Sequence, residues 1–152
     1  MNIQNKAKGF TIIEVVLVLA IAGLIFLMVF IALPALQRNQ RDTARKNDVS
    51  VVAAAVTSYT GNNKGTFPTA SQLGNYLNDL SDNSEKGNVT VNTTAATGTK
   101  ISPADAAITI VKGKTCGSAD TSGVVMNAGT TRQFAVITKL ESGGGQYFCQ
   151  TS

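Results

Sequence analysis

The chain has 152 residues, a formal net charge of +4 and no histidine. This length allows one modest domain beside a membrane segment, and the lack of histidine excludes Ser-His-Asp triads and His-containing zinc sites. Most of the excess positive charge flanks one apolar run near the N-terminus, which is typical of a membrane-associated segment rather than a nucleic-acid-binding surface. The flanking residues are Lys6, Lys8, Arg38, Arg41, Arg45 and Lys46.

The apolar run occupies residues 15–36 and contains no charged residue. As a helix it would be about 33 Å long, enough to cross a hydrocarbon core of about 30 Å. A buried core helix is the alternative, but the remaining residues could not cover a helix that is apolar all round. We therefore expect a transmembrane helix.

An ordinary signal peptide would have a shorter apolar region, followed by a small-residue cleavage site. Here the run is too long, and residues 36–41 offer no such site. A simple N-terminal anchor remains an alternative, but it leaves the sequence Lys8-Gly9-Phe10-Thr11-Ile12-Ile13-Glu14 unexplained.

These residues resemble the prepilin signal of the type IV pilin superfamily: a basic leader ending in Gly9, then Phe10 to Glu14, then the apolar run. The resemblance covers roughly the first 60 residues. It implies that a prepilin peptidase removes the leader, residues 1–9, by cleaving after Gly9, and that Phe10 is then N-methylated. It also implies a single-pass protein of the cytoplasmic membrane that an inner-membrane assembly platform adds to a homo-oligomeric helical filament, an extracellular pilus.

Glu14 stands at the start of the apolar run, where a carboxylate is costly. Insertion scales put the cost of an acid at about 2.5 to 3.5 kcal/mol at the helix centre, so the residue calls for a partner. The resemblance implies that Glu14 meets the Phe10 amine of a neighbouring subunit and so sets the register of assembly. The alternative is that Glu14 reaches the cytoplasmic headgroups.

Two helix breakers, Gly23 and Pro34, lie within the run. Pro34 lacks a backbone N–H, which predicts a bend close to it. In filaments of the family that this chain resembles, the segment between the corresponding breakers is often partly unwound. The resemblance therefore implies that both residues act in assembly. Residues 10–36 as a whole are expected to form a transmembrane and polymerisation helix.

Residues 37–60 continue the helix with an amphipathic pattern. Val49, Val52, Ala53 and Val56 recur at helical spacing and predict a face that packs on the soluble domain, and Gly61 should end the helix. The basic residues at 38–46 are interpreted as solvated surface or as ion pairs between subunits.

Residues 61–152 form the expected globular domain. The pattern at 71–80 predicts a short helix capped by Thr69 or Ser71. Strands are expected at residues 88–93, 107–111, 124–127, 133–140 and 146–150. The predicted fold class is α+β and type IV pilin-like, with a long N-terminal helix packed on an antiparallel sheet of three or four strands.

Cys116 and Cys149 make an even pair, which in an exported domain most simply forms one disulfide. The bond should tie the chain end to a loop before the strand at 124–127, as in the C-terminal loop of many resembling pilins. We expect no metal site and no cofactor. Four loop acids suggest calcium but fit no EF-hand spacing, and solvated acids are the preferred interpretation: Asp79, Asp82, Glu85 and Asp120.

The sequence contains neither a pair of carboxylates in a shared apolar setting nor a phosphate-binding loop, so neither feature indicates an enzyme. Three functional hypotheses therefore follow. The protein is a type IV pilus subunit serving adhesion, motility or DNA uptake, a pseudopilin of a type II secretion or competence machine, or a single-pass anchored binding domain that does not polymerise. A surface or DNA ligand is possible in each case and is not identified by the sequence.

Overall fold

The computed structural model describes residues 9–77, 80 and 88–152, in two compact units, Met1–Gln37 and Arg38–Ser152. Each unit is treated by itself. Several predictions lie outside the described residues: Lys6 and Lys8 of the leader, part of the predicted helix at 71–80, and the acids Asp79, Asp82 and Glu85.

Helix α1 (Ile12–Asn62) contributes to both units. The helix was predicted at residues 10–60. Its predicted start lies two residues before the observed start, and its predicted end lies two residues before the observed end. Gly61 lies within α1, and the turn after it contains Lys64 and Gly65 at positive φ (52° and 82°). The Gly65 N–H donates to the Thr60 carbonyl at 2.8 Å. A left-handed turn therefore ends the helix, as glycine permits.

The first unit contains the start of α1. No described residue up to Gln37 is buried, and the large apolar side chains of this stretch are exposed. By length and composition the helix can cross a membrane. Pro34 lies inside α1 without ending it, and the residues between Gly23 and Pro34 are helical. Whether this segment unwinds in a filament stays a prediction.

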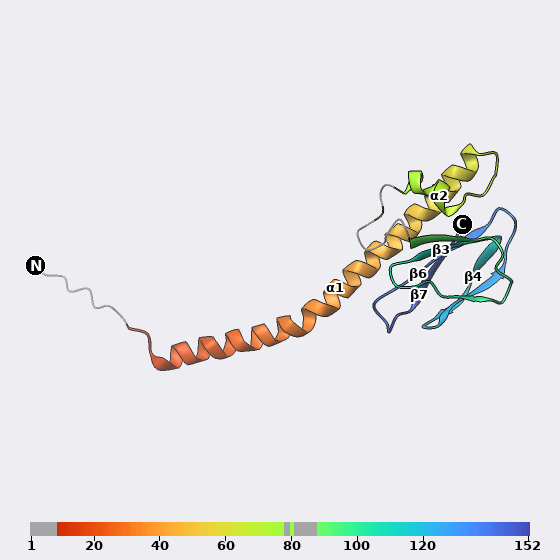
Figure 1. Ribbon diagram of the computed structural model, residues 1–152. Helices are drawn as coiled ribbons and strands as arrows, with labels where there is room; N and C mark the ends of the chain where they lie inside the picture. The colour runs from red at the N-terminus through yellow and green to blue at the C-terminus, as the bar shows by residue number, and fades with distance from the viewer. Residues whose placement is uncertain (1–8, 78–79, 81–87) are drawn as a thin grey trace, which may run out of the picture. The chain divides into compact units, whose positions relative to one another are not determined.

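In the second unit the end of α1 lies beside the β-strands (Figure 1). The predicted apolar face of the helix is confirmed, since Val49, Val52, Ala53 and Val56 are buried. They pack against a four-stranded sheet of order β1-β3-β6-β7. Its strands are β1 (Val89–Asn92), β3 (Ile108–Lys112), β6 (Phe134–Lys139) and β7 (Tyr147–Thr151). The sheet is mixed rather than purely antiparallel, because β1 runs parallel to β3.

A second sheet was not predicted. Its order is β2-β5-β4, and its strands are β2 (Lys100–Ile101), β5 (Gly123–Ala128) and β4 (Lys114–Asp120). Val124 and Met126 of β5 pack with Ala135 and Ile137 of β6. The first sheet therefore lies between α1 and the second sheet, with an apolar core on each face.

Strand β6 shows why both cores exist. Phe134 and Val136 belong to the core beneath α1, whereas Ala135 and Ile137 belong to the core between the sheets. A strand covered on both faces is apolar at successive positions rather than at every second one.

The helix predicted at residues 71–80 is shorter in the structure. Helix α2 (Ala70–Leu73) continues as one 3-10 turn (Gly74–Tyr76). Thr69 precedes the helix, and its N–H donates to Gln72 Oε1 at 2.9 Å. Leu73 and Leu77 are buried, as the helical spacing predicted.

The disulfide joins Cys116 and Cys149. The location predicted for Cys116 is wrong: it lies in strand β4 and not in a loop. Cys149 lies in β7, so the bond links the two sheets, and the Cys116 N–H also donates to Thr151 Oγ1 at 3.0 Å.

Candidate processing and assembly site

Helix α1 begins with a reciprocal pair of hydrogen bonds between Thr11 and Glu14. The Thr11 N–H and hydroxyl donate to Glu14 Oε2 at 2.8 and 2.9 Å. In return the Glu14 N–H approaches Thr11 Oγ1 at 3.3 Å. This arrangement is a capping box, in which Thr11 is the N-cap and Glu14 the third helical residue. Sequence reasoning missed this role of Glu14, although the spacing Thr-x-x-Glu before an apolar run signals it.

The capping box uses only one oxygen of the Glu14 carboxylate. Oε2 accepts both bonds from Thr11, and the structure gives Oε1 no hydrogen-bond partner among residues 9–77. An ionised carboxylate has about four lone-pair sites, so Oε1 can accept a bond from a donor outside this chain.

Gly9 and Phe10 precede the helix and are exposed. A Cβ atom at Gly9 or at Gly23 would meet nothing within 4 Å. Neither position has a positive φ that would demand glycine. The described chain therefore does not itself require glycine at either place.

The surroundings of Glu14 are apolar. A hollow on the helix surface is lined by Phe10, Glu14, Val15, Val18 and Leu19. The carboxylate thus lies beside exposed apolar side chains, in the setting where an unpaired charge is most costly once water is removed.

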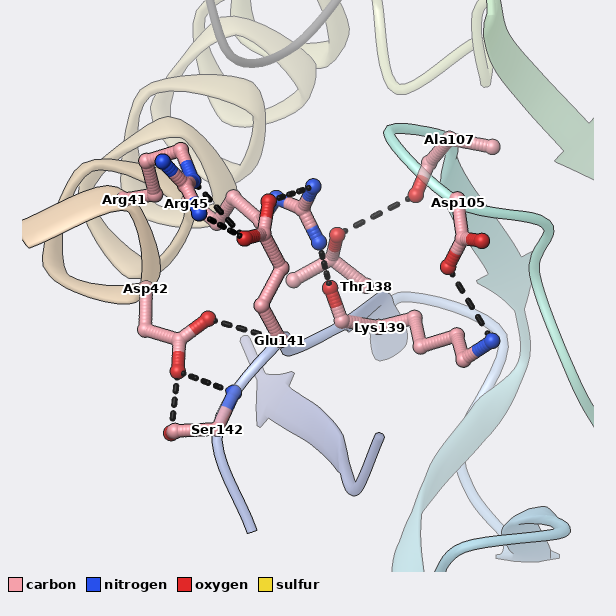
Figure 2. A network of polar contacts seen from close by, with 9 residues as sticks. All are labelled: Arg41, Asp42, Arg45, Asp105, Ala107, Thr138, Lys139, Glu141 and Ser142. Carbon is pink, nitrogen blue, oxygen red and sulfur yellow. Dashed lines mark hydrogen bonds and ion pairs between the residues drawn. The ribbon is translucent and has the colours of Figure 1, made fainter. Parts of the chain in front are cut away.

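A second polar cluster belongs to the globular unit (Figure 2). Asp42 Oδ1 accepts the Glu141 N–H at 2.6 Å, and Oδ2 accepts the Ser142 N–H at 2.8 Å and its hydroxyl. Burial opposes ionisation of Asp42, but the bonds from Ser142 and Glu141 outweigh it and lower the pKa of the carboxyl. Asp42 therefore fixes the β6–β7 loop to α1.

Two arginines complete this cluster. Arg45 is buried and donates to the Lys139 carbonyl at 2.7 Å and to Glu141 Oε1 at 2.8 Å. Arg41 donates to Glu141 Oε2 at 2.7 Å. The interpretation of these basic residues as solvated surface is wrong for Arg45, because the β6–β7 loop covers it. Sequence spacing could not show this, since the partners are about a hundred residues apart.

The structure offers no metal site in the part of the chain it describes. Asp120, one of the four acids expected in loops, is instead the last residue of β4, where it forms an ion pair with Lys100 at 2.7 Å and accepts bonds from Ser122. The hydrogen bond from Lys100 is the main cause that lowers the pKa of Asp120. This acid is held by protein groups already.

One family model matches the chain: the prokaryotic N-terminal methylation motif, over residues 4–30. No curated protein and no solved structure gave a match. The matched segment includes Gly9, Phe10 and Glu14 and ends within the apolar run. The chain therefore carries a type IV prepilin-like signal, and the predicted α+β arrangement, a long N-terminal helix with a small β-sheet, is confirmed.

Proposed function

We propose that this protein is a structural subunit of a type IV pilus filament and polymerises through residues 10–36. The observation that carries the proposal is the methylation motif joined to a helical surface that the chain itself leaves uncovered. The motif supports the broader class, a type IV pilin-like or pseudopilin structural protein, and the filament is our specific inference.

The uncovered surface needs lipid before assembly and neighbouring helices afterwards. Lipid tails are as apolar as leucine side chains, so transfer of the helix from lipid to a bundle gains little from the hydrophobic effect. Packing and polar contacts must therefore decide how subunits associate. Glu14 is the only acid within residues 10–36, so its polar contact contributes most to how the subunits associate.

Processing would create the partner for Glu14. Cleavage after Gly9 leaves a positively charged amine at Phe10, four residues before Glu14 in the sequence. In the dry interior of a filament, this amine and Glu14 Oε1 of a neighbour attract strongly, while a misplaced subunit leaves both charges unpaired. The capping bonds to Oε2 need not break for this contact to form.

Two partners would process the chain and add it to a filament. A prepilin peptidase cleaves and methylates the chain at the cytoplasmic membrane, and an inner-membrane assembly platform then adds it to a homo-oligomeric extracellular filament. Because nothing in the described part of the chain restricts Gly9, we assign its requirement to the peptidase.

Intact-mass analysis of the membrane-extracted protein tests this proposal. We expect loss of residues 1–9 and one added methyl group on Phe10, and a Gly9→Leu variant should keep its leader. A mature chain that still contains Lys6 and Lys8 would exclude the proposal.

A pseudopilin remains the second candidate, because the matched motif suits both. Electron microscopy of sheared surface material, probed for this chain, separates the two: long fibres are expected for a pilus subunit, and their absence from a processed, exported protein favours the pseudopilin. An anchored binding domain that does not polymerise has no need of cleavage at Gly9.

A further inference from the structure

A basic groove lies in the globular unit, near the end of α1. It consists of two adjoining hollows of about 430 and 370 Å³. The first is lined by the last turns of α1, the turn after it and the β5–β6 loop, and contains Lys64 and Arg132. The second contains Lys112 and Lys114. Thr131 lines both hollows, so the two lie next to each other.

The four cations of the basic groove have no carboxylate partner among the described residues. Lys112 Nζ lies 5.5 Å from the centre of the Phe67 ring, and Lys114 donates to Thr97 at 2.9 Å. The ion pairs between described residues of this unit involve other cations, namely Arg41, Arg45, Lys100 and Lys139. No acid of the described chain lines either hollow. The groove therefore has a local positive potential that nothing described neutralises.

The backbone around the basic groove is held in place. Gly113 donates to the Gln133 carbonyl at 2.7 Å, and Gly129 donates to the Gly113 carbonyl at 3.1 Å. The Gly65 N–H is bonded to the end of α1. Phe67 packs edge-on against Phe134 of the core, at 5.9 Å between ring centres. A ligand would therefore meet preformed hollows rather than order a loose segment.

We propose that the basic groove binds the phosphate backbone of duplex DNA. Ammonium and guanidinium groups beside threonine hydroxyls are the donors that contact phosphate oxygens. Two cationic hollows in series suit a polymer with repeated phosphates better than a single small anion. The only aromatic residue lining the described hollows is Phe67, which Lys112 and Phe134 already contact, so unpaired bases find no stacking surface.

This inference goes beyond filament assembly, since no residue of the groove belongs to residues 10–36. It predicts binding that is independent of base sequence and sensitive to salt. With up to four phosphate contacts, the logarithm of the binding constant should fall with the logarithm of salt at a slope of about −3.6.

The test measures binding of the full chain, in detergent micelles, to a fluorescent duplex of mixed sequence over a range of salt concentrations. The groove variant is Lys64→Gln/Arg132→Gln. The matched control is Arg38→Gln/Lys46→Gln, which removes the same charge from exposed positions that line neither hollow. Thermal unfolding of both variants, compared with the unmodified chain, confirms that each is folded.

We expect the groove variant to bind at least about tenfold more weakly and to lose about 2 from the salt slope, while the control stays close to the unmodified chain. Equal loss in both variants would reduce the effect to net charge and overturn the proposal. So would no binding by the unmodified chain, tighter binding of single-stranded DNA, or displacement of the duplex by a glycerol-phosphate polymer at lower phosphate concentration.

Discussion

The two halves of α1 differ in what covers their apolar side chains. Every buried residue of the helix lies at or after Asp42, and none lies in residues 12–41. The second half presents one apolar face that the sheet covers, whereas residues 15–36 of the first half are apolar all round and are not covered by the described chain. The second half is thus covered by its own chain, and on the proposed function the first half is covered by lipid or by other subunits.

Their carboxylates show the same difference. Asp42 uses both oxygens to accept bonds from the β6–β7 loop. Glu14 uses Oε2 for Thr11 and retains Oε1. Asp42 is therefore fully engaged within the chain, while Glu14 keeps the capacity for one contact outside it.

Removing the disulfide should give the largest change in stability, and this change should be confined to the globular unit. Replacing Cys116 and Cys149 by serine opens a loop with a sequence separation of 33 residues. In the chain-entropy model this lowers the free energy of unfolding of the globular unit by about 4 kcal/mol. Thermal unfolding of the full chain checks the loss. Cleavage after Gly9 should be unchanged, and failure of cleavage would contradict the independence of the two halves.

Asp42→Ala should lower the free energy of unfolding by about 2 to 3 kcal/mol, because it leaves partly buried backbone donors of the β6–β7 loop unpaired. Chemical denaturation at neutral pH measures this. Asp42→Asn should be less damaging, since its amide oxygen can keep one of the bonds.

The same site should make stability depend on pH. Because the pKa of Asp42 is lowered in the folded state, its contribution is present above the ordinary aspartate pKa of about 4 and is lost as pH falls through the folded value. Arg41, Arg45 and Glu141 are the charged groups around it. The Asp42→Asn chain should lose less stability than the unmodified chain between pH 5 and 2, and identical acid profiles would contradict the assignment.

Thr11→Val should give the smallest effect, about 1 kcal/mol, by removing the hydroxyl of the N-cap. Hydrogen exchange of the Thr11 and Glu14 amides in detergent micelles should become about fivefold faster. Thr11→Ser keeps the hydroxyl and serves as the control. Equal exchange in Thr11→Val and the unmodified chain would show that the capping box does not hold the helix start.

Local patterns predicted much of this molecule. The apolar run, the motif from Gly9 to Glu14, the buried face of α1 and most strands are visible as periodicity or spacing. Strand β4 was missed because Lys114 to Asp120 contains few β-branched or large apolar residues, and it is held by pairing with β5 and by Cys116. The Asp42 and Arg45 contacts were missed because they join distant segments, and a single sequence does not show which charges meet.

The central claim is that Glu14 has one oxygen for its own helix and one for the amine of a neighbour. It is tested by counting fibres sheared from cells expressing Glu14→Ala, beside Glu14→Gln and the unmodified chain. For Glu14→Ala we predict that fibres vanish or shorten while processed, membrane-bound monomer accumulates with its disulfide formed. Glu14→Gln should be intermediate, because glutamine can still cap at this position but carries no charge. A normal fibre count from Glu14→Ala would contradict the claim.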